Sequence, residues 1–353
     1  MSNSTPSMQE KPVSTMKAVY TAAPGAVEVR EVPTPTVGPE DVLVRMRACG
    51  ICGTDLGFVA AGGMPYLGQP IALGHEPAGE VVDVGARVTD ISVGDHVVVN
   101  PMSAPSGIIG NGGALGALRE LLVIENARVG RDLAIIPESL PFWLAALNEP
   151  MAVAKHLVNR GAPLSSESAV VFGAGPIGLG AAIWLKLAGV SHVVVVDVVR
   201  ARLDKAIDVG ADAVIDSSNE DVAARLMELH GEAANAIGMP RPATDLYLDA
   251  AGAPSVLQTA IASAKWGARL VMAGVHKQPE LIDTGQMMIA ELTFSSSMGY
   301  PTEIFEVTAD LIAHQERFAK LVSHRIDFGD VESAIELAGT PGATDKVVIT
   351  FGP

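Results

Sequence analysis

The sequence predicts an α/β fold in which an irregular, mostly antiparallel β domain precedes a doubly wound parallel sheet. Residues 16 to about 150 are rich in Val, Gly and Pro, and their short apolar runs are broken by turn signals such as "SVGD". From about residue 151, strand-like and helix-like segments alternate, as in "AVVFGAGPIG", "LGAAIWLKLAG" and "HVVVVD". Such alternation is typical of a parallel sheet covered by helices.

The individual elements follow from local patterns. In the first part we expect strands at "MKAVY", "DVLVRMRA", "PAGEVVDVG" and "DHVVVN". In the second, "VVRARLDKAIDVG" reads as an amphipathic helix that ends at Gly210, and "DAVID", "DLYLDAAG" and "GARLVMAGV" read as strands. The tail holds one helix, "YPTEIFEVTADLIAHQERF", and a closing strand, "TDKVVITF", which we expect to return to the first domain.

These patterns predict three regions of the chain. We expect a polar leader at 1–15, a β-rich domain made of 16–155 and 300–353, and a parallel-sheet domain at 156–299. The leader has neither the apolar core of a secretory signal nor the Arg-rich pattern of a transit peptide.

Composition excludes several classes of protein. Of the 353 residues, 48% are apolar and 18% charged, which is a globular composition, and the longest apolar runs fall short of a membrane span. The net charge of −16 disfavours nucleic acid as a partner, because phosphate contacts need a basic surface. Only two cysteines are present, so no disulfide framework is expected, and this fits the cytoplasm.

A glycine-rich turn predicts a dinucleotide site. Gly173, Gly175 and Gly178 follow an apolar strand in the G-x-G-x-x-G spacing and open a helix. The first permits a tight turn, the second lets the backbone approach a pyrophosphate, and the third lets the helix pack on the strand. Asp197 ends the next strand, where a carboxylate can accept both ribose hydroxyls of NAD and would repel the 2′-phosphate of NADP.

The sequence therefore favours a Rossmann domain that prefers NAD to NADP. Arg200 and Arg202 lie close enough to blur that preference, either by stacking on adenine or by neutralising a 2′-phosphate. The remaining cofactor-binding residues that we predict are Pro176, Ile177, Arg202, Ala273, Gly274 and Val275.

Cys49 and Cys52 lie in "ACGICGTDLG" and are the two cysteines of the chain. A Cys-x-x-Cys pair can be a redox couple, half of a zinc site, or one metal ligand beside a bystander. A redox couple usually opens a helix in a thioredoxin-like setting, whereas this pair follows a β-like run. His75 and Glu76 in "GHEPAGEVVDVG" and Glu149 in "NEPMAVAKH" add an imidazole and two carboxylates, and such a set suits zinc.

Six motifs together resemble the zinc-dependent medium-chain alcohol and polyol dehydrogenases. They are "CGICGTDL", "GHEPAGEVVDVG", "GDHVVVNP", "EPMAVAKH", "GAGPIG" and "DVVRARLDKAIDVGAD", and they occur in the family's order from about residue 16 onward. The resemblance implies a GroES-like catalytic domain beside the Rossmann domain. It also implies reversible hydride transfer between a secondary alcohol, diol or polyol and NAD, in a homodimer or homotetramer joined through the nucleotide domains.

The resemblance also assigns roles to residues. It implies that Cys52 and His75 bind the catalytic zinc and that Glu76 or Glu149 supplies the third ligand, with exchange between the two acids during turnover. Each acid can equally hold a ligand in place by a hydrogen bond. Thr54 is expected to accept the proton of the substrate alcohol.

Other residues near the motif have lesser expected roles. Cys49 is expected to pack as a small apolar residue, and Asp55 to bind an Arg across the domain. His156 is expected to be a helix or cleft-wall residue. Phe58, Tyr66 and Met298 are candidates for the wall of the substrate pocket.

The sequence departs from the family pattern in two places. The region after "VVVNP" has neither cysteine nor histidine where many members bind a second, structural zinc, so one zinc per chain is expected. Gly57 follows Leu56 where members often carry a relay histidine.

Two other functions on the same fold stay open. The first is a zinc-independent quinone or enoyl reductase, which would not need Cys52, His75 and Glu76 together. The second is a nucleotide-binding protein that has lost turnover, which the missing relay histidine favours slightly.

Overall fold

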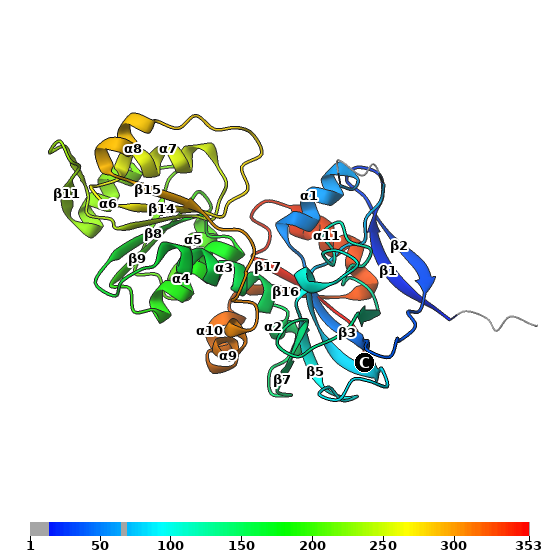
Figure 1. The fold of residues 1–353 in the computed structure, drawn as a ribbon. Helices are drawn as coiled ribbons and strands as arrows, with labels where there is room; N and C mark the ends of the chain where they lie inside the picture. Colours follow the sequence, from blue (N-terminus) through cyan, green and yellow to red (C-terminus); the bar gives the residue numbers. More distant parts are fainter. Residues whose placement is uncertain (1–13, 65–68, 353) are drawn as a thin grey trace, which may run out of the picture.

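The computed structural model describes residues 14–64 and 69–352, so most of the predicted leader lies outside the described residues. A parallel sheet and a mostly antiparallel sheet form the two halves of the molecule, with helix α3 (Asn148–Gly161) between them (Figure 1). These halves correspond to the α/β class predicted from the sequence.

The parallel sheet has six strands in the order β10-β9-β8-β13-β14-β15, and every neighbouring pair is parallel. Because the order reverses between β8 and β13, the sheet is doubly wound, and its ligand crevice is expected at the carboxyl ends of the strands around this point. The strands are β8 (Ser168–Phe172), β9 (His192–Asp197), β10 (Ala213–Asp216), β13 (Leu246–Asp249), β14 (Arg269–Met272) and β15 (Thr293–Ser296).

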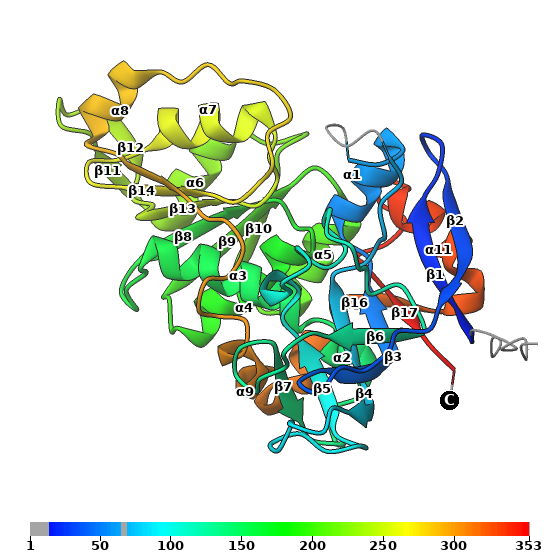
Figure 2. The ribbon, with the colours of Figure 1, turned by 45° about the vertical axis from the view of Figure 1, so that its right-hand side comes forward.

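Helices cover both faces of this sheet (Figures 1 and 2). They are α4 (Pro176–Leu187), α5 (Arg200–Asp208), α6 (Val222–His230), α7 (Pro254–Ser263) and α8 (Thr284–Ala290). A small hairpin of β11 (Glu232–Ala234) and β12 (Pro240–Pro242) follows α6. The valines at 193–196 in β9 are all buried, as expected for a strand covered on both faces.

The second sheet has the order β16-β17-β3-β4-β5-β7, with β6 also paired to β3. Its strands are β3 (Val42–Gly50), β4 (Glu76–Val84), β5 (His96–Val99), β6 (Leu121–Ile124), β7 (Leu133–Ile136), β16 (Val322–Asp327) and β17 (Lys346–Thr350). Beside it lie the hairpin of β1 (Thr15–Thr21) and β2 (Val27–Pro33), then α1 (Gly53–Ala61), the 3-10 turn η1 (Pro101–Ser103) and α2 (Phe142–Ala145). One core cluster includes Ala48 of β3, Leu147 beside α3 and Val171 of β8, so the apolar interior continues across both halves.

The tail crosses back to the antiparallel sheet, where β17 pairs with β3 (Figure 1). The single helix predicted from "YPTEIFEVTADLIAHQERF" is wrong. His314 leaves the helical region with φ −124° and ψ 34°, which separates α9 (Glu306–Ala313) from α10 (Gln315–Ala319). The tail also contains the turn η2 (Phe328–Asp330) and α11 (Val331–Gly339). In the described part of the chain, no helix has the length and apolar character needed to cross a bilayer.

Candidate active site

Three of the four predicted metal ligands, Cys52, His75 and Glu76, meet where β3 ends and β4 begins. These strands are antiparallel, and Gly50 lies opposite Glu76 in the register. Cys52 is the N-cap of α1, and one ligand atom from each of Cys52, His75 and Glu76 lies within 4.8 Å of the other two. A thiol, an imidazole and a carboxylate at this separation fit a zinc ion.

Asp55 contacts the segments that carry Cys52 and His75. Its carboxylate is fully buried, accepts the N–H of Cys52 at 2.9 Å and that of Gly74 at 3.1 Å, and lies 3.4 Å from His75 Nδ1. The predicted contact with an Arg is therefore wrong. Asp55 stands at the third position of α1, from which its short side chain folds back onto the N-cap backbone.

The pairing of Asp55 with His75 orients the imidazole. Burial alone would raise the pKa of Asp55, but the charge of the neighbouring His75 and the two backbone donors lower it below its usual value. Burial likewise disfavours charged His75, whereas Asp55 and Cys52 raise the pKa of His75 well above its usual value. Because Asp55 faces Nδ1, the other ring nitrogen is left to bind a metal.

Glu76 is fully buried. It belongs to the set of candidate metal ligands and also forms an ion pair with Lys346. The Nζ atom of Lys346 donates to Glu76 Oε1 at 2.5 Å and to the carbonyl of Ile51 at 2.8 Å. Oε2 has no hydrogen-bond partner among the described residues, and a Cβ added at Gly50 would lie 1.7 Å from it. Lys346 was not predicted from the sequence, although a lysine beside the apolar run in "DKVVITF" is a signal for a buried charge.

Glu149 lies in the first turn of α3, but it is not part of the close set of three ligands. Its carboxylate faces the hydroxyl of Tyr300 and feels the charges of His75 and Glu76. Burial, helped by the charge of Glu76, raises the pKa of Glu149 to about 7, although His75, Lys346 and Tyr300 oppose this. Burial and the neighbouring Glu149 also raise the pKa of Tyr300. Nothing in the local sequence indicated Tyr300.

The remaining residues of the "ACGICGTDLG" motif have distinct environments. Cys49 is completely buried in the apolar core, as predicted, and burial raises the pKa of its thiol. Thr54 is half-buried in the first turn of α1. A Cβ at Gly57 would meet no atom within 4 Å, so this position supplies only open space where an imidazole could have stood.

The candidate pocket-wall residues have different environments. Phe58 packs against the apolar core, Met298 is 83% exposed, and Tyr66 lies outside the described residues. His156 bonds through Nδ1 to Glu303 Oε1 at 2.9 Å, so it joins α3 to the segment before α9.

The glycine-rich turn has the three properties expected of a phosphate-binding turn. Gly173 follows β8 with φ +95°, which favours glycine, and a Cβ at Gly178 would lie 1.7 Å from the Gly173 carbonyl oxygen. Gly175 is the N-cap of α4, and a Cβ there would meet nothing within 4 Å. This open space at a helix N-terminus fits a pyrophosphate.

Asp197 ends β9 and lies directly beside this turn. It accepts the N–H of Ala174 at 2.7 Å through Oδ2, and the N–H groups of Val198 and Val199 through Oδ1. The carboxylate is therefore fixed at the edge of the sheet where a ribose is expected. Arg202 lies in α5, and its Nε has no partner among the described residues.

The last three predicted cofactor residues follow β14 at the same edge of the sheet. Ala273 and Gly274 are half-buried, whereas Val275 is 80% exposed.

Comparison with known proteins identifies the family of the chain. Residues 38–132 match the alcohol dehydrogenase GroES-like domain, and residues 176–314 match the zinc-binding dehydrogenase family. The chain is a member of the zinc-dependent medium-chain dehydrogenase family.

Several relatives of this dehydrogenase are known. It is 31% identical to an L-threonine 3-dehydrogenase from Symbiobacterium thermophilum, over 95% of this chain and 97% of the relative. It is 32% identical to an (R,R)-butanediol dehydrogenase from Neisseria gonorrhoeae, over 81% and 84%. The crystal structure of 2R,3R-butanediol dehydrogenase from Bacillus subtilis superposes with a TM-score of 0.83 at 27% identity, covering 95% and 99% of the two chains.

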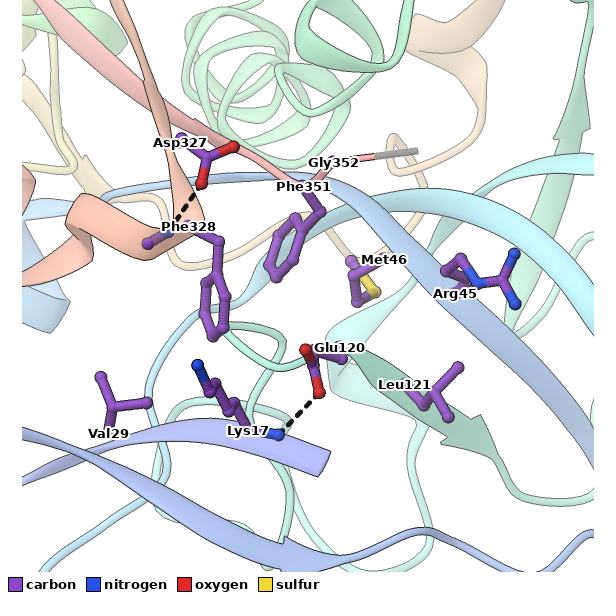
Figure 3. A pocket seen from close by; sticks show the side chains of 11 residues that line it. Lys17, Val29, Arg45, Met46, Glu120, Leu121, Asp327, Phe328, Phe351 and Gly352 are labelled. Carbon is purple, nitrogen blue, oxygen red and sulfur yellow. Dashed lines mark hydrogen bonds between the residues drawn. The ribbon is translucent and has the colours of Figure 1, made fainter. Parts of the chain in front are cut away.

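A groove of about 680 Å³ elsewhere on this dehydrogenase contains none of the predicted site residues (Figure 3). Its walls carry the opposite charges of Lys17 and Glu120, and the rings of Phe328 and Phe351 stack at 4.6 Å between centroids. The groove therefore lies apart from the candidate chemistry.

Proposed function

We propose that this dehydrogenase oxidises a small secondary alcohol or diol reversibly, with NAD as the hydride acceptor. The observation that carries the proposal is the close set formed by Cys52, His75 and Glu76, combined with the glycine-rich turn of the parallel sheet. A zinc ion bound by that set would act as a Lewis acid and stabilise the alkoxide form of the substrate. The relatives named for butanediol favour a diol as substrate.

The protein residues divide the work as follows. Cys52 and His75 would hold a zinc ion, and Asp55 beside Nδ1 fixes the orientation of the imidazole. Glu76 would supply the third ligand, because its Oε2 atom has no hydrogen-bond partner among the described residues while Lys346 donates to Oε1. Glu149 is the alternative third ligand and faces Tyr300.

Thr54 accepts the proton of the alcohol. Thr54 follows Cys52 by two residues and lies in the first turn of α1, where its hydroxyl can act as a proton acceptor. Since position 57 is a glycine, no imidazole at that position takes the proton onward, and the relay beyond Thr54 would use water, a hydroxyl of the bound cofactor or another histidine.

We also propose one zinc per chain and a preference for NAD. The segment 101–120 contains no cysteine and no histidine, so it offers no ligands for a second, structural zinc. Asp197 favours NAD, because its carboxylate would repel a 2′-phosphate.

A homodimer or homotetramer formed through the parallel-sheet half is the proposed assembly. Strand β15 ends the sheet without a further partner among the described strands. Large apolar side chains are exposed around that half, namely Ile237, Trp266, Leu281 and Met288. Exposed apolar surface of this kind favours association. Light scattering of the eluting protein measures the assembly, and a monomer at micromolar concentration would contradict it.

Metal analysis and substrate assays on matched cysteine variants test the catalytic proposal. Purified protein should contain about one zinc per chain and reduce NAD faster than NADP with diols or secondary alcohols. Cys52→Ser should abolish activity and zinc binding, whereas Cys49→Ser should keep both, because Cys49 is buried in the core. An active enzyme free of metal would support a zinc-independent reductase instead. A zinc-loaded, NADH-binding protein that turns over no alcohol would support a protein that has lost catalysis.

A further inference from the structure

Asp249 lies at the end of β13 and is completely buried. Its Oδ1 atom accepts the N–H groups of Ala251 and Gly252, each at 2.9 Å. Its Oδ2 atom lies 2.8 Å from Nε2 of His276. One buried carboxylate thus joins the loop after β13 to a histidine in the loop after β14.

The main chain connects the same two loops. The carbonyl of Asp249 accepts the N–H groups of Ala273 and Gly274, each at 2.9 Å. A Cβ at Gly274 would lie 2.1 Å from the amide nitrogen of Gly252, and a Cβ at Gly252 would lie 2.6 Å from the carbonyl oxygen of Val275. The two loops therefore lie backbone against backbone, and a change in one displaces the other.

His276 is the side chain that closes this arrangement. Its side chain is only 9% exposed, whereas the preceding Val275 is 80% exposed, so the imidazole lies inward and the valine outward. Its Nδ1 atom lies 3.6 Å from Glu280 Oε1, which is too long for a hydrogen bond. Asp249 is accordingly its hydrogen-bond partner among the described residues.

The position of these loops in the sheet relates them to one half of the cofactor. The glycine-rich turn and Asp197 belong to β8 and β9, which form the first mononucleotide half of the sheet. Strands β13 and β14 belong to the other half, beyond the reversal of strand order. A Cβ at Gly173 would lie 3.0 Å from the Cβ of Ala251, so the loop after β13 touches the phosphate-binding turn itself.

We propose that His276 and Asp249 are positioning residues for the nicotinamide half of the dinucleotide. The pair fixes the backbone of 273–275, so that this segment meets the nicotinamide ribose in one conformation. The inference rests on the proposed function only in taking a nicotinamide dinucleotide as the ligand. It requires neither zinc nor turnover.

Binding of ligands that share only one half of the dinucleotide tests the inference. NADH and AMP are titrated into wild-type protein and His276→Ala, with NADH followed by its fluorescence and AMP by calorimetry. We expect the Kd for NADH to rise about tenfold in His276→Ala, as for the loss of a charge-assisted hydrogen bond. The Kd for AMP should stay within twofold, because AMP occupies only the β8–β9 half. His276→Gln, which can still donate to Asp249, should recover most of the affinity for NADH.

Two comparisons separate this outcome from general damage. His156→Ala removes another buried histidine–carboxylate pair, at 2.9 Å from Glu303, and should leave both affinities unchanged. If His276→Ala unfolds, His276→Gln and His276→Asn carry the test, with thermal unfolding as the check of folding. An equal rise of the Kd values for NADH and AMP in His276→Ala, or an unchanged Kd for NADH, would overturn the inference. Wild-type protein that binds NADH without oxidising any alcohol would instead overturn the catalytic proposal and leave this inference standing.

Discussion

Acid should destabilise this protein through His230, a histidine far from the candidate active site. His230 ends α6, and its Nδ1 atom lies 2.7 Å from the hydroxyl oxygen of Thr244. Its Nε2 atom is buried without a partner among the described residues, and its ring meets that of His192 edge-on at 5.1 Å between centroids. Burial, together with His192 and Lys265, lowers the pKa of His230 to about 4, although Asp245 acts in the opposite direction.

The sign and size of the effect follow from proton linkage. A histidine with a pKa near 6.5 in the unfolded chain and about 4 in the folded protein binds more protons when unfolded. The contribution of His230 to the free energy of unfolding is therefore fully present above pH 6.5 and is lost as the pH falls toward 4. Between pH 7 and pH 5 the two pKa values give a loss of about 2 kcal/mol in the free energy of unfolding.

Urea denaturation at several pH values measures this loss. The midpoint of wild-type protein should fall steeply between pH 6.5 and pH 5, and His230→Gln should lose most of that dependence. Since His314 is exposed, His314→Gln serves as the control and should keep the wild-type dependence. If His230→Gln shows the same pH dependence as wild type, the acid sensitivity does not come from this buried imidazole and the reasoning is wrong.

The remaining predictions concern the candidate active site. Lys346→Met leaves the buried carboxylate of Glu76 without its cation and should lower the free energy of unfolding by about 3–5 kcal/mol, measured by urea denaturation in the presence of a chelator. Asp55→Ala removes the partner of the metal-facing histidine and should weaken zinc binding about 10- to 100-fold, measured by competition with a chromophoric chelator. Gly175→Ala should fold normally but bind NADH more weakly, because its methyl group would occupy the open space above the turn. Gly178→Ala should instead lower the melting temperature, because its methyl group would collide with the backbone of Gly173. Calorimetry and NADH fluorescence distinguish these two glycine variants.

Controls and contrary outcomes are available for each of these. Arg200→Ala breaks an exposed pair with Asp204 and should change the free energy of unfolding by less than about 1 kcal/mol. Lys346→Met with wild-type stability would show that Glu76 is not held by this pair. Unchanged zinc affinity in Asp55→Ala would show that Asp55 does not contribute to zinc binding. Equal loss of melting temperature in both glycine variants would contradict the open space assigned to Gly175.

The sequence by itself determined the features that depend on short stretches of chain. The glycines of the turn after β8 were predictable because each acts on its own turn or on the helix that follows directly. Cys52, His75 and Glu76 were predicted as neighbours from their motifs, and the antiparallel pairing of β3 with β4 brings them together. The alternation of strands and helices likewise indicated the parallel sheet, since the hydrophobic period is a local property.

Only the tertiary structure decided which distant side chains enter these sites. Lys346 reaches Glu76 from 270 positions away because β17 joins the sheet beside β3. Asp55 was assigned to a distant arginine, whereas its short side chain accepts the backbone N–H groups of Cys52 and Gly74 and lies beside His75.

The same holds for the contact between His276 and Asp249, which depends on β13 and β14 being neighbours in the sheet. The pairing of strands is set by burial summed over the whole core, and no short stretch of sequence carries that information. The motifs therefore predicted the chemistry of the site, whereas the residues that orient the site residues could be identified only in the folded chain.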